Sequence, residues 1–439
     1  MSGLAKQLKW SSGLVILTVV ALLFLVPYSL FVHRAEPEVT EIFFADRITE
    51  AHRVLIERYN TLHAGSIRVI PIDFPNPDFS TNERKEILAR SLRGEGDGID
   101  LLAVDVVWVQ RFEKWCEPLN GYFSERELQA ILPELLASCY SDGKLVAIPL
   151  DMVLAVMYYR EDLLKSAEGG EQVIRTLDRS LTWPEFLEVK QRLHWGKPFY
   201  VFPAADYEGL ICSYVEILLG LNKSYFTAVG FNFETAEAKK ALQLLVDLVH
   251  KYKATPPVVT SFTEVPSYQY FLSNDGLFIR GWTSYDEDFK NSPYDMQKRL
   301  QLRKAPLPHL PGGKPASTFG GWHLMVSKFS SKKSAVVDFV KFLLREESQE
   351  VFYTQGGYYP VISSFYQDST SLRKYPEIAD IKRLMRTGVH RPPQKEYTHF
   401  SEIMSHYFTL AIQNRISVDE ALSGATRAIR SEQTLVATR

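Results

Sequence analysis

Residues 10–32 carry no charged side chain, and this run constrains the architecture of the chain more than any other feature. Its sequence is WSSGLVILTVVALLFLVPYSLFV, with Lys6 and Lys9 before it and His33 and Arg34 after it. As a helix rising about 1.5 Å per residue it would be roughly 34 Å long, enough to cross a hydrocarbon core about 30 Å thick. No comparable run follows in the sequence. We therefore predict a single folded body attached to one N-terminal membrane helix.

The same run could instead be a secretory signal that is removed, or the apolar start of a cytosolic protein. A cleaved signal has a shorter apolar region and then a small-x-small site, and residues 31–35, FVHRA, offer no such site. Two lysines before the run and one arginine after it give a slight positive-inside bias. We expect residues 1–9 in the cytoplasm, residues 10–32 as an uncleaved transmembrane signal anchor, and residues 33–40 as a tether to an extracytoplasmic body.

Composition narrows the range of partners and cofactors. The chain has 50 basic and 52 acidic residues among 439, a balance that gives no reason to expect a nucleic-acid partner. Its three cysteines, Cys116, Cys139 and Cys212, form no C-x-x-C pair and have no histidine-rich neighbourhood, so neither a metal centre nor a cofactor is expected. An exported compartment permits disulfides. Cys116 and Cys139 flank one helical segment and could form a disulfide or remain free buried thiols.

Short apolar strands alternate with helices at the start of the body. The pattern predicts strands at 41–45, 66–72 and 100–104 and helices at 49–61 and 82–92. Apolar strands alternating with helices indicate a parallel sheet covered on both faces. In such sheets ligands sit beyond the carboxyl ends of the strands. Asp46, Arg47 and Asp105, which directly follow predicted strands, are therefore candidate binding residues.

The later part of the chain predicts a second α/β unit. Strands are expected at 147–150, 155–159 and 276–279, helices beginning at Thr182 and spanning 235–250, and a proline-rich irregular segment at 305–314. Thr182 is a favourable N-cap, with Pro184 in the first turn of its helix. Two α/β lobes joined by more than one crossing segment fit this order.

A series of motifs occurs in an order typical of one known family. The motifs are GKLVAIP (143–149), YYREDLL (158–164), TWPEF (182–186), ETAEA (234–238), FLSNDGLFIRGW (271–282), GGW (320–322), GGYYP (356–360) and ISVDEAL (416–422). Each motif is weak alone. Their shared order over residues 40–425 resembles extracellular (periplasmic) solute-binding protein family 1, the maltose/trehalose-type sugar-binding components of ABC importers.

The resemblance implies a fold of the periplasmic-binding-protein type, class II: two α/β lobes joined by hinge strands. It assigns residues 41–150 and 306–345 to lobe 1 and residues 151–305 and 346–439 to lobe 2, with hinges at 149–153 and at Ala305–Pro306. It also implies capture of a sugar or oligosaccharide between the lobes, hinge closure, and delivery to an ABC permease. The family usually carries a lipid anchor or a cleaved signal, so a transmembrane anchor is a departure from its pattern.

The resemblance further implies a set of ligand-binding residues. They are Arg84, Asp105, Asp151, Trp282, Gly321 and Trp322, with Asp46, Arg47, Tyr358 and Arg391 as further candidates. In the family, tryptophans at the positions of Trp282 and Trp322 often stack on sugar rings, while carboxylates and guanidinium groups bind the hydroxyls.

Each of these residues also has a purely structural interpretation. Either tryptophan could fill a lobe core, Asp105 could cap the next helix, and Arg84 could lie on a solvated helix face. Trp108 and Tyr158 match better as core. Val153 stands where some disaccharide-binding relatives have an acidic ligand, and Asp46-Arg47 replaces a small polar pair. These departures count against maltose or trehalose as the solute.

Two other functions use similar residues. A ligand-sensing receptor that signals to a membrane partner would also profit from a fixed anchor. A glycosidase would need paired carboxylates near a sugar, but no nucleophile elbow, metal-ligand cluster or acid/base motif is visible in the sequence. We therefore expect a binding protein, with no enzymatic activity, at the extracytoplasmic face of the cell membrane.

The uncharged run predicts that the native protein keeps its N-terminus. Mass spectrometry of the protein purified from its own membrane should detect peptides from residues 1–32, because no cleavage site follows the run. A mature N-terminus near Ala35 would instead identify the run as a discarded signal.

Overall fold

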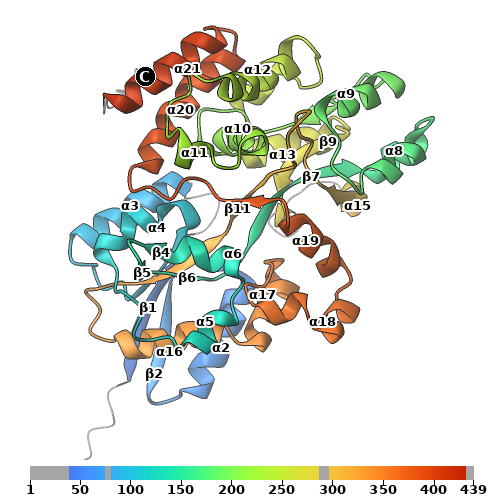
Figure 1. Ribbon diagram of the computed structural model, residues 1–439. Coiled ribbons are helices and arrows are strands. Elements are labelled where there is room, and N and C mark those ends of the chain that lie inside the picture. The colour runs from blue at the N-terminus through green and yellow to red at the C-terminus, as the bar shows by residue number, and fades with distance from the viewer. Residues whose placement is uncertain (1–38, 75–80, 286–295, 432–439) are drawn as a thin grey trace, which may run out of the picture.

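The computed structural model describes residues 39–74, 81–285 and 296–431. Within these ranges the chain folds into two α/β lobes, each built on its own main sheet (Figure 1). Each lobe also has its own large cluster of buried apolar side chains. The two-lobed α/β architecture expected from the sequence is thus confirmed.

The sheet of the first lobe has five strands in the order β2-β1-β3-β12-β6. Their bounds are β1 (Thr40–Asp46), β2 (Ile67–Asp73), β3 (Leu101–Asp105), β6 (Ile148–Pro149) and β12 (Trp322–Val326). β2 and β3 flank β1 in parallel, while β12 runs antiparallel to β3 and to β6. The parallel strands expected from the alternating pattern are therefore present, and the carboxyl ends of β1 and β3 carry Asp46 and Asp105.

Helices cover this sheet and contribute the remaining first-lobe elements. They are α2 (Glu50–Leu62), α3 (Thr81–Arg93), α4 (Val109–Phe112), α5 (Glu125–Gln129), α6 (Pro133–Leu136), α16 (Lys333–Leu343) and α17 (Glu346–Gly356), with a small hairpin of β4 (Tyr140–Ser141) and β5 (Lys144–Leu145). α2 and α16 pack together, and rings from both interlock: the Tyr59 ring lies 4.9 Å from that of Phe339, which contacts Phe44 of β1 at 5.9 Å. This aromatic contact fixes the helices on the sheet.

The sheet of the second lobe has the order β13-β11-β7-β9-β8, with β10 also paired to β7. Its strands are β7 (Val153–Arg160), β8 (Tyr200–Val201), β9 (Phe278–Trp282), β10 (Leu302–Ala305), β11 (Ser317–Gly320) and β13 (Gly388–Val389). β7 is antiparallel to β9, β10 and β11. All its side chains except that of Val153 are buried, as expected for the central strand of a covered sheet.

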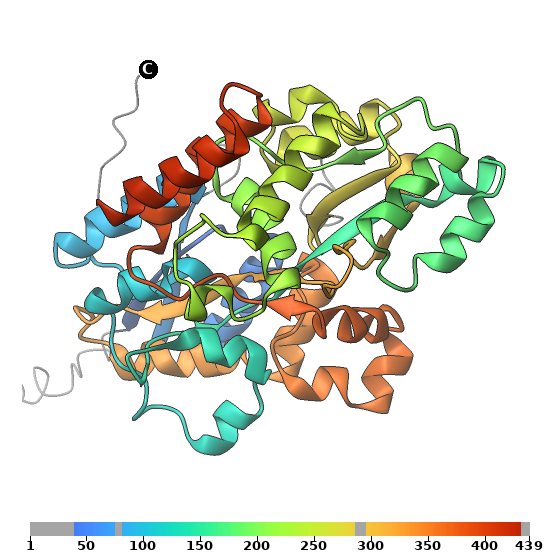
Figure 2. The ribbon, with the colours of Figure 1, turned by 45° about the horizontal axis from the view of Figure 1, so that its top comes forward.

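The second lobe is rich in helices. They are α7 (Glu161–Ser166), α8 (Gly170–Thr176), α9 (Trp183–Arg192), α10 (Glu208–Leu221), α11 (Tyr225–Ala228), α12 (Ala236–His250), α13 (Glu264–Ser273), α15 (Met296–Leu300), α18 (Ser369–Lys374), α19 (Glu377–Met385), α20 (Tyr397–Ile412) and α21 (Val418–Arg430). α10, α12, α20 and α21 form one packed group, which Figure 2 shows beside α3 of the first lobe. Thr182 caps α9 as predicted, since its hydroxyl accepts a hydrogen bond from the Glu185 amide.

The chain passes between the lobes at three places that lie close together. Residues 150–152 join β6 to β7, Gly321 joins β11 to β12, and residues 357–359 leave α17 and bridge to Met152 through Tyr359. The crossing expected at 149–153 agrees with the first of these.

The predicted lobe boundaries differ from the structure elsewhere. Ala305 pairs with Met157 inside the second sheet, and β11 belongs to the same sheet, so the chain enters the first lobe at Gly321 and not at Ala305–Pro306. α17 and Tyr358 pack in the core of the first lobe, although the prediction gave residues from 346 onward to the second. Prolines suggested the earlier boundary, whereas the backbone actually turns at a glycine.

The cysteine pairing left open by the sequence does not form. Cys116, Cys139 and Cys212 are free and buried, and the Cys139 thiol contacts the Leu135 carbonyl oxygen at 3.6 Å. Burial raises the pKa of each thiol, because a thiolate in this apolar setting would lose its hydration. All three therefore behave as small core side chains.

The predicted cytoplasmic residues 1–9, the membrane anchor 10–32 and the tether up to residue 38 lie outside the described residues. In the parts of the chain that are described, no helix combines the length and the apolar character needed to cross a membrane.

Gly321 should tolerate no side chain. Its φ of 116° lies in a region that favours glycine, and an added Cβ would meet the Asp151 carbonyl oxygen at 2.6 Å. Gly321→Ala should lower the free energy of unfolding in urea by about 1–3 kcal/mol from backbone strain alone, and by more from the overlap. Gly121→Ala, in an exposed turn where a Cβ meets nothing within 4 Å, is the matched control. Equal stability of the two variants would contradict this assignment.

His323 should make the fold sensitive to acid. Burial of this β12 side chain lowers its pKa from 6.5 to about 4, so the folded state excludes a proton that the unfolded state binds. The resulting destabilisation of the folded state is absent above pH 6.5 and grows to about 3 kcal/mol as the pH falls to 4. Urea unfolding at pH 7 and 4.5 should show a smaller loss of stability in His323→Gln than in the parent. His194→Gln, at an exposed position, should match the parent.

Candidate functional site

Trp282 and Trp322 lie on either side of the Gly320–Gly321 crossing. Trp322 is the first residue of β12 and pairs with Asp105, while Trp282 is the last residue of β9 and pairs with Ala155. A Cβ on Gly320 would lie 3.2 Å from the Trp282 ring, so this glycine lets the indole pack against the backbone. Both indoles are half-buried. The fold therefore brings together two aromatic surfaces, one from each lobe.

One face of Trp322 is covered by a buried arginine. The guanidinium carbon of Arg84, on α3, lies 3.9 Å from the centre of the Trp322 ring system, and the edge of this indole meets the Trp108 ring. A guanidinium at this distance is attracted to the negative face of the indole. Arg84 is therefore buried at the strand ends, and the solvated-face interpretation of this residue is wrong.

Asp46 holds Arg84 in place. Its Oδ1 accepts a 2.9 Å hydrogen bond from Arg84 Nη2, and its Oδ2 lies 3.3 Å from Nε2 of the buried His52. Burial raises the pKa of Asp46, but the hydrogen bond and charge of His52, the charge of Arg84 and the Arg47 amide together leave it below its ordinary value. The carboxylate is therefore ionised and forms an ion pair with Arg84.

The second lobe repeats this arrangement with other elements. The guanidinium carbon of Arg280 lies 4.2 Å from the centre of the Trp282 ring system, and its Nη2 donates a 2.7 Å hydrogen bond to Glu216 on α10. The Thr318 hydroxyl donates a further bond to the same carboxylate oxygen. Arg280 and Glu216 are both buried. In each lobe, then, a carboxylate holds an arginine against one face of a tryptophan.

Asp151 connects two of the crossing segments. Its carboxylate accepts a 3.1 Å hydrogen bond from the Trp322 backbone amide, and its own carbonyl oxygen faces Gly321. The side chain is almost fully buried. This aspartate therefore fixes the backbone that presents Trp322.

Asp105 and Arg391 contact each other across the lobes. Asp105 caps the turn after β3 by accepting a bond from the Val107 amide, and its Oδ1 lies 3.5 Å from Nη2 of Arg391. Arg391 also bonds to Glu208 at 2.9 Å. Burial alone would lower the pKa of this guanidinium, but the charges of the neighbouring groups, Asp105 and Glu208 among them, raise it well above its ordinary value. Capping, one of the two roles considered for Asp105, is thus present.

Two further groups border the tryptophans. Arg47 donates a bond to the Tyr358 hydroxyl at 3.3 Å, beside the Asp46 cluster. Glu264, at the start of α13, is half-buried near Tyr207, Arg280 and Trp282, and burial raises its pKa. A carboxyl group and a phenol beside an indole are groups that bind hydroxyl-bearing ligands.

Every residue singled out from the sequence for binding falls in this region. His52, Glu208, Glu216, Glu264 and Arg280 were not singled out. Glu216 and Arg280 had a detectable signal, because each is a lone charge within an apolar run, EILLGL or GLFIRGW, and such a charge needs a buried partner. Trp108 and Tyr158 are buried in the cores, as expected.

A separate hollow lies on the first lobe, away from these residues. It has a volume of about 730 Å³ between α2 and the start of α17, lined by residues that include Leu62, Phe342 and Arg345. Among the residues that the structure describes, no cluster of histidine, cysteine and carboxylate side chains is suited to hold a metal ion.

Comparisons with known proteins agree with this architecture. Residues 77–380 match the family of bacterial extracellular solute-binding proteins. A probable ABC transporter-binding protein of Deinococcus radiodurans is 25% identical over 362 residues, which cover 80% of this chain and 83% of that protein.

Solved structures give the same result. The maltose-bound MalE3 protein of T. maritima superposes with a TM-score of 0.78 at 25% identity, over 90% of this chain and 100% of that one. A cyclic α-maltosyl-1,6-maltose binding protein from Arthrobacter globiformis shares the fold at 21% identity, with a TM-score of 0.72 over 90% and 98% of the two chains. The chain is a member of the bacterial extracellular solute-binding protein family.

Proposed function

We propose that this protein captures a saccharide between Trp282 and Trp322 and delivers it to an ABC-type permease. The observation that carries the proposal is the pair of half-buried indoles, one from each lobe, each with an arginine on one face. An arginine covers one face of each half-buried indole, and we assign the opposite face to the ligand. Planar apolar surfaces of this kind bind the C–H faces of sugar rings.

The polar groups around the indoles suit the hydroxyls of a sugar. Glu264 interacts with the Trp282 side chain, Asp105 pairs with Trp322 between neighbouring strands, and Arg47 bonds to the Tyr358 hydroxyl. Asp46, Asp151 and Arg84 are engaged mainly with the protein itself. We therefore assign Trp282, Trp322, Arg47, Asp105, Glu264 and Tyr358 to direct contact, and the other candidates to support of these residues.

The relatives support this class of ligand. The related T. maritima structure is described as maltose-bound, and folds of the same type bind tagatose, ribitol and mannitol. Family membership places the body outside the cytoplasm. We further propose that residues 10–32 anchor it to the membrane, so that it reaches its permease by lateral diffusion at a raised effective concentration.

A thermal-shift screen of the full-length chain in detergent tests the proposal. Maltose, cyclic maltosyl-maltose, tagatose, ribitol and mannitol form a first panel, with acidic amino acids as an unrelated class. A ligand that binds only the native state raises the midpoint of unfolding. Stabilisation by no saccharide, together with stabilisation by another class, would refute sugar capture.

Removing either indole should weaken binding of the best saccharide from this panel. Trp282→Ala and Trp322→Ala should each cost about 1–3 kcal/mol of binding free energy by titration calorimetry, taking base stacking on aromatics as the scale. Trp282→Phe, which keeps an aromatic ring, should lose less binding free energy than Trp282→Ala. Trp195→Ala is the control, because this half-buried indole bonds to the Pro198 carbonyl in a turn after α9. Parent-like affinity in both alanine variants would contradict the site.

A further inference from the structure

One segment of the second lobe makes a row of polar contacts with the first. Residues 390–402 leave β13, run beside the first lobe and enter α20 (Figures 1 and 2). Along this segment His390, Arg391, Lys395, Thr398 and Glu402 each contact a residue between positions 85 and 142. We call residues 390–402 the strap.

Arg391 anchors the inner end of the strap. Its side chain is 2% exposed and bonds to Glu208 of its own lobe while approaching Asp105 of the other. The Tyr397 hydroxyl donates a 2.8 Å bond to the same Glu208 carboxylate, and Ser401 donates to it as well. The strap is thus fixed to its own lobe before it reaches across.

Glu402 makes the contact at the outer end. Its carboxylate lies 3.2 Å from Nζ of Lys85 on α3 of the first lobe. Lys85 is 4% exposed, a rare degree of burial for a lysine, whereas Glu402 is 56% exposed. The only other carboxylate within 4 Å of this ammonium group, among the described residues, is Glu86 at 3.8 Å. Lys85 therefore depends on the opposite lobe for its closest counter-charge.

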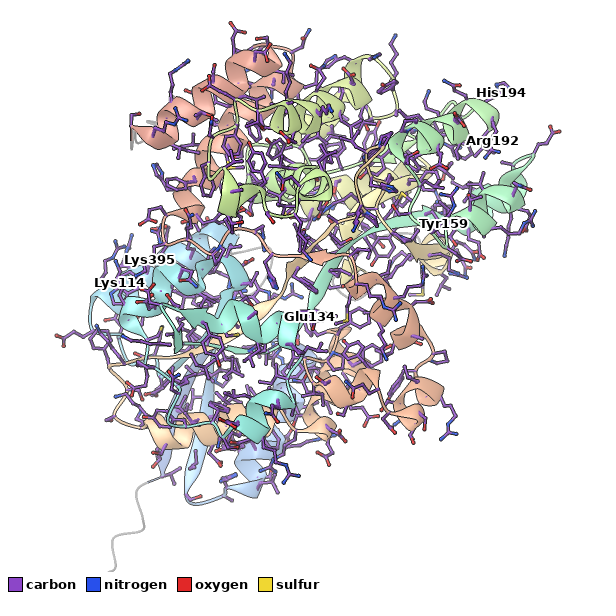
Figure 3. All side chains as sticks on the ribbon, in the orientation of Figure 1. Lys114, Glu134, Tyr159, Arg192, His194 and Lys395 are labelled. Atoms are coloured by element: carbon purple, nitrogen blue, oxygen red, sulfur yellow. The ribbon has the colours of Figure 1, made fainter. Side chains whose placement is uncertain are left out.

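Two further contacts lie between these ends. Lys395 reaches Asp142 at 3.2 Å and Glu113 at 3.5 Å, and Figure 3 shows its side chain beside the first lobe. Arg111 of α4 donates a 3.1 Å bond to the Thr398 hydroxyl. Lys395 is half-exposed, and exposed pairs contribute little. We therefore attribute most of the coupling to Lys85 and Arg391, whose side chains are buried.

We propose that the strap holds the two lobes together and that Lys85 and Glu402 are positioning residues, which set the separation of Trp282 from Trp322. Lys85 adjoins Arg84, the residue stacked on Trp322, so a shift of α3 at Lys85 moves the first-lobe half of the site. The positioning of the two indoles for a ligand rests on the proposed function, but the attachment of one lobe to the other by the strap does not. It acts in the absence of solute.

Distance measurement between spin labels tests the strap. Labels at Lys114→Cys in the first lobe and Arg427→Cys on α21, which packs on α20, report the distance between the lobes of the full-length chain in detergent, without solute. Both positions are exposed, whereas the three native cysteines are buried and escape labelling. Glu402→Lys places a second positive charge against Lys85. Lys85→Glu combined with Glu402→Lys restores the pair with its charges exchanged.

Glu402→Lys should shift the distances to longer values, and the double exchange should return them toward those of the parent. Asp419→Lys is the matched control, because it reverses an exposed carboxylate of α21 whose partner, Lys239 at 2.7 Å, lies in the same lobe. Parent-like distances in Glu402→Lys, an equal shift in Asp419→Lys, or no rescue by the exchange would overturn the proposal.

Saccharide affinity separates this inference from the proposed function. If the strap positions the indoles, Glu402→Lys should weaken binding of the best saccharide and the exchange should restore it. Stabilisation by no saccharide, together with stabilisation by another class of compound, would refute saccharide capture and leave the distance result standing. Unchanged distances with intact sugar binding would refute the strap alone.

Discussion

The hydrogen bond from the Trp322 amide to the Asp151 carboxylate connects two of the three segments that join the lobes. It exists because Gly321 has no side chain and adopts a φ of 116°, which lets the two backbones approach closely. Residues 150–152 and 320–322 are thereby locked to each other at the centre of the molecule. The placement of both sheets, and of the indoles that end β9 and begin β12, depends on this small junction.

Two buried ion pairs then fix the aromatic surfaces. A buried arginine loses its hydration, and this loss is compensated only when a carboxylate and further hydrogen bonds satisfy the group. Asp46 meets this need for Arg84, and Glu216 with Thr318 meets it for Arg280. A planar guanidinium held in this way has little freedom to rotate, so it makes a rigid backing for an indole. Breaking either pair would leave a charge in the core beneath the proposed binding surface.

Local sequence pattern was enough to predict much of the first lobe. The strands β1, β2 and β3 and the aspartates after β1 and β3 were placed within a residue or two, because apolar runs and their polar ends are local features. The boundaries between the lobes were harder to predict. Prolines near residue 306 indicated a crossing, whereas strand pairing carries the chain on to Gly321.

The partners of the site residues could not be read from sequence. Arg84 and Trp322 meet only because α3 and β12 pack at the same sheet edge, and Arg280 meets Glu216 only through the packing of α10 on the second sheet. Such contacts join residues far apart in the chain, where no spacing rule applies. A lone charge in an apolar run does show that a partner must exist.

The free, buried cysteines have a consequence for how the protein matures. A fold that needs disulfides can be completed only where an oxidant and an isomerase are available. In the part of the chain that the structure describes, no covalent cross-link contributes to either lobe, and the raised pKa of each thiol suppresses the reactive thiolate. The body can therefore reach the same native state in a reducing or an oxidising compartment, and changes in redox conditions outside the cell should leave it intact.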